Sequence, residues 1–256
     1  MTTVQQLPER MRKFIKNLHI RKIRDADQKF IAEGPKIVQE LLNSTFTIEL
    51  VVVRNDAVET QQELITTLLK LNIPVYTANN YHFEYICDAK SPQGVVAVAS
   101  FYHQLITPVT SFIALDGIND PGNVGTIIRT AHWFGVQTIL LNKGSVDRYN
   151  PKAVRSTMGS LFHCNVIETD LQQTLTEYKQ THELYGATLE ATLPIEECEP
   201  QQNFGIIIGS ESHGISPVIR KLLSHEYTIM GAGLAESLNA AVAAGISLYH
   251  FTMFVE

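Results

Sequence analysis

The chain has 256 residues, of which 45% are hydrophobic and 18% are charged, a composition typical of a globular protein with one large domain or two modest ones. Its most apolar stretch, residues 240–254, is interrupted by Ser247 and His250 and is shorter than the roughly 20 apolar residues that a membrane helix requires. The N-terminal residues carry charges without an apolar core, unlike a signal peptide, so we expect a cytoplasmic protein.

The net charge of −6 disfavours a nucleic-acid partner, because phosphate binding relies on lysine and arginine. The charge is uneven, however, since residues 1–30 contain eight basic and three acidic side chains, a net charge of +5 against −11 for the remainder. A solvated helix face and an RNA-binding patch both account for this basic segment. The cysteines Cys87, Cys164 and Cys198 are widely spaced and odd in number, which argues against a disulfide framework and a zinc site.

The first hundred residues predict alternating helices and strands. Helices are expected in the basic segment before Phe30 and over residues 34–42 and 60–71, and strands at residues 49–55, 74–78 and 94–102. The polar segment 103–110 contains Pro108. We therefore place a boundary there, between a first domain at residues 1–105 and a second at residues 111–256.

The second domain repeats the order strand, glycine-containing turn, helix. Strands are expected at residues 112–118, 137–142, 183–189 and 204–211, and helices at residues 123–134, 151–158 and 236–253. Continuous apolar strands separated by helices predict an α/β fold with a parallel sheet covered on both faces. Ligands of such sheets bind beyond the carboxyl ends of the strands, so the functional residues should lie in the turns that follow them.

The first of these turns, residues 116–135, contains Asp120 and Pro121, which suit the start of a helix. Asn123 and Arg129 are six residues apart, and this spacing does not place them on one helix face. The turn contains neither GxxxxGK[ST] nor GxGxxG, which argues against a nucleotide-phosphate loop and against a dinucleotide-binding oxidoreductase.

Two further turns follow later strands. Glu211 is the one acid at the end of the strand before it, and taken alone a helix-start carboxylate or a local hydrogen-bond acceptor explains it best. In the third turn Glu236 and Ser237 are expected to open an alanine-rich helix. Gly245 within that helix costs about 1 kcal/mol relative to alanine, which suggests that another group passes close to it.

Taken together, the segments DPGNVGTIIRTAHWFG, IIIGSESHGIS and ESLNAAVAAGISLY resemble the three motifs of the SpoU (TrmH-type) family of RNA 2'-O-ribose methyltransferases. The resemblance covers about 140 residues, and YNPKAVRSTMGSLF is similar to the family's intermediate segment. In the first domain, KNLHIRKIRDADQKFIAEG and SPQGVVAV resemble a ribosomal-protein-like substrate-binding domain that is often fused to this family.

The resemblance implies a SPOUT-type α/β knot, with a deep trefoil knot that binds S-adenosylmethionine, and a homodimer. Matching positions give the implied cofactor-binding residues as Gly209, Ile229 and Leu238, and the implied catalytic residues as Arg129, Asn123, Glu211, Ser237 and Asn239. The implied reaction is methylation of a ribose 2'-hydroxyl, and the fused first domain favours ribosomal RNA over transfer RNA as partner.

Arginine chemistry and two departures from the family pattern refine these expectations. Because a guanidinium hardly loses its proton, Arg129 is expected to hold a neighbouring phosphate and stabilise the developing alkoxide, with the hydroxyl proton leaving through phosphate or water. Arg155 either adds a phosphate contact or forms an ion pair. Met230 replaces the family's usual proline, which would loosen the cofactor loop, and Ala241 replaces its second serine.

Three rival functions share the predicted fold: a transfer-RNA ribose methyltransferase, a base methyltransferase, and a catalytically silent RNA-binding or assembly protein. The set of polar residues implied as catalytic disfavours the silent protein, and an arginine directed at ribose disfavours base methylation. The sequence leaves open which nucleotide is methylated and whether the role is housekeeping or antibiotic resistance.

Overall fold

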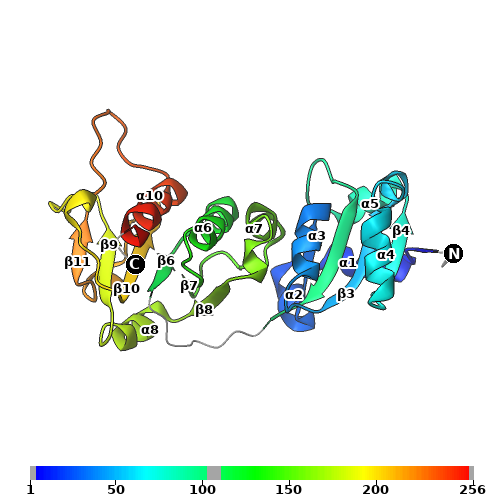
Figure 1. Cartoon of the computed structure of the whole chain (residues 1–256), viewed down its shortest axis with the longest axis horizontal. Helices are drawn as coiled ribbons and strands as arrows, with labels where there is room; N and C mark the ends of the chain where they lie inside the picture. Colours follow the sequence, from blue (N-terminus) through cyan, green and yellow to red (C-terminus); the bar gives the residue numbers. More distant parts are fainter. Residues whose placement is uncertain (1–3, 103–110, 254–256) are drawn as a thin grey trace. The chain divides into compact units, whose positions relative to one another are not determined.

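A computed structural model describes residues 4–102 and 111–253 of the chain. The chain folds into two compact units (Figure 1). The N-terminal unit comprises Met1–His103 together with Tyr149–Phe162, and the C-terminal unit comprises Gln104–Arg148 and His163–Glu256. The boundary that the sequence suggests, at residues 103–110, lies outside the described residues. The division at that boundary assigned residues 149–162 to the second domain, whereas in the structure they pack with the first unit.

The N-terminal unit contains a mixed five-stranded sheet in the order β1-β4-β3-β5-β2. Its strands are β1 (Gln5–Gln6), β2 (Lys29–Glu33), β3 (Ile48–Arg54), β4 (Val75–Ala78) and β5 (Val95–Ser100). Its helices are α1 (Glu9–Asn17), α2 (Arg21–Asp27), α3 (Pro35–Leu42), α4 (Gln62–Lys70), α5 (Asn80–Ile86) and α7 (Pro151–Ser156). Strand β2 and helix α5 were not predicted from the sequence.

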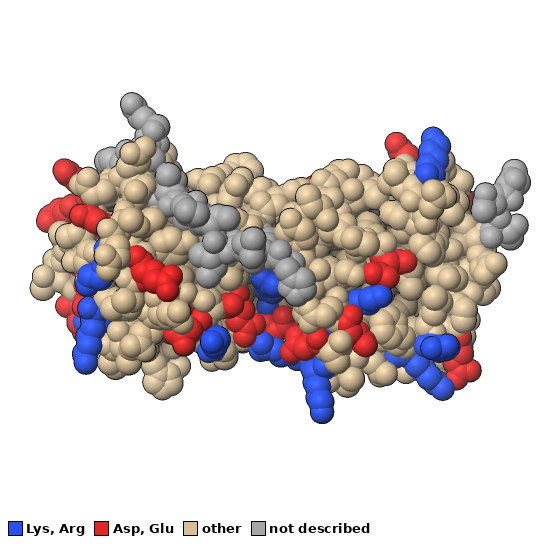
Figure 2. All heavy atoms as spheres, turned by 90° about the horizontal axis from the view of Figure 1, so that it is seen from below, with Lys and Arg blue, Asp and Glu red and all other residues tan. Residues whose placement is uncertain are grey.

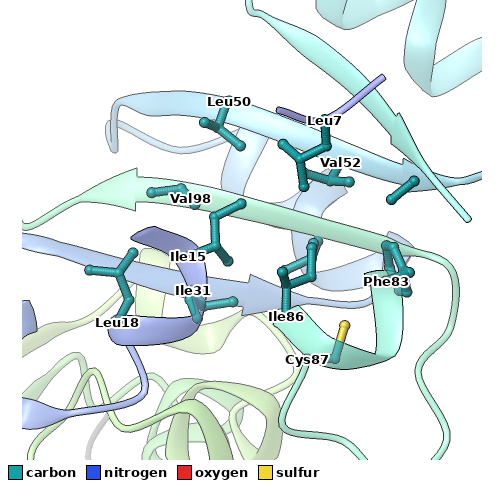
Figure 3. Packing of buried hydrophobic residues seen from close by; sticks show 12 residues of the cluster. Leu7, Ile15, Leu18, Ile31, Leu50, Val52, Phe83, Ile86, Cys87 and Val98 are labelled. Atoms are coloured by element: carbon teal, nitrogen blue, oxygen red, sulfur yellow. The ribbon is translucent and has the colours of Figure 1, made fainter. Parts of the chain in front are cut away.

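Successive side chains of each strand point to opposite faces of the sheet, so this unit has buried residues on both faces. On one face, Ile31, Val52 and Val98 are fully buried against Ile15 of helix α1 and Ile86 of helix α5 (Figure 3). The residues between them on these strands are buried on the opposite face, where α3 and α4 contact the sheet. Because both faces are covered, the central residues of β3 and most residues of β2 and β5 are buried, whereas the short edge strand β1 is exposed.

Residues 149–162 complete this core with aromatic side chains. The ring of Tyr149 stacks on Phe101 at 4.1 Å and on Phe30 at 4.6 Å between ring centroids. Phe162 meets Phe46 edge to face at 5.2 Å. Aromatic pairs of this kind contribute about 0.5–1.5 kcal/mol each beyond the burial of their area. The segment is therefore an integral part of the N-terminal unit.

The C-terminal unit contains a six-stranded sheet in the order β11-β9-β10-β6-β7-β8, all of whose pairs are parallel. Its strands are β6 (Ser111–Asp116), β7 (Thr138–Asn142), β8 (Asn165–Thr169), β9 (Glu183–Ala187), β10 (Phe204–Gly209) and β11 (His225–Tyr227). Its helices are α6 (Pro121–Trp133), α8 (Leu171–Tyr178), α9 (Pro217–Arg220) and α10 (Ala240–Thr252). The predicted parallel α/β sheet is confirmed, although β8 and α8 were not identified from the sequence.

Helices cover both faces of this sheet. Phe112 and Ile207 pack with Leu171 of α8 and Ile219 of α9 on one face, and helices α6 and α10 pack against each other on the other. Strands β6 and β10 are neighbours in register, with Asp116 opposite Gly209. Parallel strands end at the same edge, so the turns that leave β6 and β10 begin side by side. In the described part of the chain, no helix is long and apolar enough to cross a membrane.

Candidate active site

The turn after β6 leads directly into helix α6. Asp120 is the N-cap, its side chain accepting a hydrogen bond from the backbone N–H of Asn123 at 2.9 Å, and Pro121 occupies the first turn. Both residues act as the sequence predicted. The aspartate side chain accepts a hydrogen bond from a free backbone N–H group, and proline has no N–H group that would need a partner. Asn123 is thereby fixed in the first turn of α6, next to the end of the sheet.

Asp116 holds three segments together at this edge. The residue is buried, with only 5% of its surface exposed. One oxygen accepts a hydrogen bond from the side-chain amide of Asn142 at 2.7 Å, and the other accepts one from the backbone N–H of Ser216 at 2.8 Å. Asp116 therefore links the end of β6 to the end of β7 and to the turn after β10. Sequence reasoning missed this role, although an acid that ends an apolar strand was a signal for it.

The turn after β10 closes on itself through the backbone. Ser210 and Gly214 exchange two backbone hydrogen bonds, of 2.9 and 3.1 Å. A Cβ atom at Gly209 would lie 2.0 Å from the carbonyl carbon of Gly214 and 2.2 Å from the nitrogen of Ile215. No side chain fits at that distance, so the turn itself requires glycine at position 209. Glu211 lies at the exposed tip of this turn.

The third turn ends at Asn239, which caps helix α10. Its side-chain oxygen accepts hydrogen bonds from the backbone N–H groups of Ala241 at 2.9 Å and Val242 at 3.4 Å. The prediction that Glu236 and Ser237 open this helix was wrong, since both precede its first residue, Ala240. The reason is that asparagine at the cap satisfies two free N–H groups, and its extended backbone, with ψ of 141°, interrupts any helix before it.

Side chains from the three turns meet in one hydrogen-bonded chain. The amide nitrogen of Asn239 donates to the amide oxygen of Asn123 at 3.1 Å, and the amide nitrogen of Asn123 donates to the carboxylate of Glu211. The capping bonds define the orientation of the Asn239 amide, because its oxygen is already accepting and only its nitrogen remains to donate. Asn123 then offers an oxygen to Asn239 and a nitrogen to Glu211. Three of the five residues implied as catalytic are thus connected.

Arg129 and Ser237, the other two implied catalytic residues, take no part in these hydrogen bonds between Glu211, Asn123 and Asn239. Arg129 is exposed on helix α6, and none of the described residues forms an ion pair or a hydrogen bond with its guanidinium. Ser237 lies in the exposed segment before α10. The guanidinium is therefore available to an anion from solution, on the same helix that carries Asn123.

Residues 230–239 form an exposed loop between β11 and α10, the orange segment that extends away from the sheet in Figure 1. Its base is anchored by Tyr227, whose buried hydroxyl donates to Ser247 of α10 at 2.7 Å and whose pKa is raised by burial. No backbone hydrogen bond joins residues 229–238 to any other described residue. Leu238 and Met230 are exposed in this loop, and Ile229 is half-buried where it begins.

The free backbone groups of this loop fit a cofactor that carries an adenine. Adenine offers hydrogen-bond donors and acceptors on a flat apolar ring, and backbone N–H and C=O groups in a mostly apolar surrounding satisfy such a ring. Ile229 and Leu238 supply apolar side chains at the two ends of the loop. The residues present therefore fit S-adenosylmethionine.

The structure also bears on two residues outside the three turns, Arg155 and Gly245. Of the two alternatives for Arg155, the structure has the ion pair: its guanidinium lies 2.6 Å from Asp88 and 3.4 Å from the buried carboxylate of Glu33. Among the described residues no group passes unusually close to Gly245, contrary to expectation, because a Cβ atom there would meet only Thr130 at an ordinary 3.8 Å.

Comparison with known proteins defines the class to which this fold and site belong. The SpoU rRNA Methylase family matches residues 110–249, and the MRM3-like substrate binding domain matches residues 11–97. The chain belongs to the SpoU family and is an RNA methyltransferase that uses S-adenosylmethionine.

Individual relatives match both units. The 23S rRNA (guanosine(2553)-2'-O)-methyltransferase RlmP of Bacillus subtilis is 30% identical, over 92% of this chain and 93% of its own length. A putative TrmH-family RNA methyltransferase from Porphyromonas gingivalis is 31% identical, with a TM-score of 0.81 over 96% of this chain and 98% of its own. The AdoMet-bound rRNA methyltransferase from Sinorhizobium meliloti is 27% identical, with a TM-score of 0.86 over 98% of this chain and 97% of its own.

Proposed function

We propose that this protein transfers the methyl group of S-adenosylmethionine to a ribose 2'-hydroxyl of ribosomal RNA in the cytoplasm. The observation that carries the proposal is the hydrogen-bonded chain Glu211–Asn123–Asn239, built at the end of the sheet on the helix that also presents the free guanidinium of Arg129. The full-length similarity to an enzyme named as a 23S rRNA 2'-O-methyltransferase supports ribosomal RNA as the substrate.

The polar residues divide the work between positioning and charge stabilisation. Asn123, Glu211 and Asn239 connect the three turns, which keeps α6 and α10 in place around the reacting groups. Arg129 binds the phosphate next to the target ribose and stabilises negative charge that develops on the 2'-oxygen. Because the guanidinium stays protonated, the hydroxyl proton leaves to phosphate or water. Ser237 adds a hydroxyl from the loop that precedes α10.

The cofactor is held by the turn after β10 and by the exposed loop. When bound, S-adenosylmethionine supplies an electrophilic methyl group on sulfur. Gly209, at the end of β10, and Ile229 and Leu238, at the two ends of the loop, would hold the cofactor. We propose that these segments form the deep trefoil knot of this unit, which would bring the turn after β10 and the loop at residues 230–239 to the same cofactor.

A homodimer accounts for a second feature of the C-terminal unit. Helix α10 exposes Val242, Ile246 and Tyr249, and its C-cap residue Met253 is exposed too; their spacing places them along one stripe. Trp133, which is 84% exposed, ends the neighbouring helix α6. Apolar stripes of this kind mark association sites, and a two-fold axis lets one stripe pack against its own copy.

The sole tryptophan reports on this association directly. On dilution of the protein, the emission of Trp133 should shift to longer wavelength as the dimer dissociates, together with the change in mass seen by sedimentation. Ile246→Glu should give the monomer at all concentrations, whereas Val218→Glu, on the exposed surface of helix α9, should not. A monomeric wild-type protein would contradict the dimer.

Methyl transfer is tested with methyl-labelled S-adenosylmethionine and with ribosomal and transfer RNA in separate reactions. Label in ribosomal RNA that appears in alkali-resistant dinucleotides supports the proposal, because alkaline cleavage requires a free 2'-hydroxyl. Label confined to transfer RNA would contradict ribosomal RNA as the substrate. Label in a base would contradict methylation of the ribose. Cofactor binding without any transfer would support the silent RNA-binding protein.

A further inference from the structure

Two tyrosines of the N-terminal unit have exposed side chains. Tyr81 is 76% exposed and Tyr85 is 43% exposed, and both lie on helix α5. Residues four apart share one face of a helix, so the two rings form a single aromatic surface. The opposite face of the same helix is anchored in the core by Phe83 and Ile86, both fully buried. The helix is therefore held firmly while its two tyrosines face solvent.

Lysines of helix α1 border this aromatic surface. Helices α1 and α5 pack together, and the ammonium group of Lys16 lies 5.5 Å from the centre of the Tyr85 ring. Lys13 lies on the same helix, three residues before Lys16, and its ammonium group is paired with Glu9 at 2.8 Å on an exposed surface. Lys16 itself has no ion pair with any residue that the structure describes.

The local charge also differs from the rest of the chain. Helices α1 and α5 together carry four basic and two acidic side chains, although the whole chain has a net charge of −6. On the face drawn in Figure 2, Lys and Arg side chains lie interspersed with Asp and Glu side chains. The four basic side chains of these two helices therefore lie close to the two exposed tyrosines of α5 in the fold.

We propose that Tyr81 and Tyr85 form a stacking platform for a single-stranded segment of the RNA substrate, with Lys13 and Lys16 beside its phosphates. Unstacked bases present flat π-faces that aromatic side chains bind whatever the base, and adjacent cations bind the backbone. A duplex hides these faces, so the platform selects loops and ends over helices. The inference rests on the proposed function, because it takes RNA as the partner.

Binding of fluorescent RNA, measured by anisotropy with the full-length protein, tests the platform. The probes are an unstructured 12-nucleotide RNA and a 12-base-pair RNA duplex. Tyr81→Leu with Tyr85→Leu keeps apolar bulk and helix propensity but removes the rings, and Tyr81→Phe with Tyr85→Phe keeps the rings. Each stacked base contributes about 5- to 150-fold in affinity, so the leucine variant should bind the single strand at least about 10-fold more weakly and the phenylalanine variant about normally.

Two controls separate stacking from general electrostatics. Lys36→Ala with Lys70→Ala removes two exposed cations from helices α3 and α4 of the same unit and should change single-strand binding less than Lys13→Ala with Lys16→Ala. A 4-thiouridine RNA should crosslink to helix α5, as located by mass spectrometry. Equal binding of the single strand by the leucine variant and the wild type would overturn the platform, as would crosslinks that fall only outside α1 and α5.

The failure of this inference is distinguishable from failure of the proposed function. If the wild type methylates RNA but the leucine variant binds the single strand normally, only the platform is wrong. If the wild type binds no RNA and transfers no methyl group, the proposed function fails first. Retained RNA binding together with loss of a co-purifying protein in the leucine variant would instead identify the tyrosines as a protein-binding surface, which contradicts the platform.

Discussion

Asn123→Asp is the substitution that addresses the three-turn hydrogen-bond chain most specifically. Aspartate has nearly the same shape as asparagine, so packing around helix α6 is unchanged. The side-chain nitrogen that donates to Glu211 becomes an oxygen, and a hydrogen bond is replaced by two carboxylates in contact. The bond from Asn239 survives, because the oxygen that accepts it remains. The change therefore breaks one link of the chain and leaves the other.

The expected cost has two parts. The lost hydrogen bond, in an exposed position, is worth about 1 kcal/mol. Two unit charges about 4 Å apart repel by about 1 kcal/mol in water and by about 4 kcal/mol at an effective dielectric constant of 20, and exposure of Glu211 favours the lower value. We therefore expect destabilisation of the C-terminal unit by about 2 kcal/mol at pH 7, a decrease in Tm of roughly 4–8 °C.

The pH dependence distinguishes this explanation from simple loss of a contact. Repulsion raises the pKa of the two carboxyls in the folded state, so the folded protein binds protons more readily than the unfolded chain. The repulsive part of the cost is then complete above the raised pKa and disappears as the pH falls through it. Thermal unfolding at pH 7 and pH 5 should show a smaller defect at pH 5 for Asn123→Asp, and the same defect at both for Asn123→Ala.

A double substitution completes the test. Glu211→Gln added to Asn123→Asp reverses the polarity of the link, since the glutamine nitrogen then donates to the new carboxylate. Stability should return to within about 0.5 kcal/mol of the wild type. A pH-independent defect, or no recovery in the double variant, would refute the hydrogen-bonded link between the first two turns.

Three further predictions concern residues that shape the two units. Asp116→Ala leaves the N–H groups of Ser216 and Asn142 without their acceptor and should cost about 2–3 kcal/mol in urea unfolding; a cost below about 0.5 kcal/mol would show that Asp116 does not hold the turns. Gly209→Ala forces a Cβ atom into backbone and should abolish cooperative thermal unfolding, whereas an unchanged Tm would contradict the close approach. Arg155→Met leaves the buried carboxylate of Glu33 without its cation and should destabilise the N-terminal unit by about 3 kcal/mol, and Arg155→Met with Glu33→Gln should recover part of this loss; equal stability of Arg155→Met and wild type would refute the pair.

Much of the C-terminal unit follows from its sequence because local signals and tertiary packing agree there. The apolar run of residues 204–209 forms a buried parallel strand, as periodicity predicted, and Asp120 caps the helix that it was expected to start. The segments that resemble the three SpoU motifs also indicated Asn123, Glu211 and Asn239, which lie in three separate turns. Only the three-dimensional structure shows that these side chains form one hydrogen-bonded chain.

Other features depend on contacts that no local pattern contains. Glu236 and Ser237 have the composition of a helix start, yet the helix begins at Ala240, where Asn239 satisfies the free N–H groups. Strand β2 follows a basic helix and was missed, because its stability comes from pairing with β5, about 65 residues away in the sequence. Residues 149–162 belong to the N-terminal unit because Tyr149 stacks on Phe30 and Phe101. Both phenylalanines are far from Tyr149 in the sequence, so no local pattern predicts these contacts.

The discontinuous N-terminal unit affects how the two units should be separated. Removal of residues 1–105 would expose the buried surfaces of Tyr149 and Phe162. Such a truncation would change the C-terminal part as well as remove the proposed RNA-binding unit. Point substitutions in the full-length chain, such as those in α5, are the better means of assigning RNA binding to the first unit.

The most direct test of the proposed reaction compares wild type and Arg129→Ala on ribosomal RNA. Single-turnover transfer of labelled methyl is measured beside cofactor affinity by calorimetry. We predict an unchanged cofactor Kd and a loss of at least about 100-fold in the rate of 2'-O-methyl nucleoside formation, because the guanidinium acts on the RNA and on the developing charge. A near-normal rate for Arg129→Ala, or a wild-type product methylated on a base, would contradict the account.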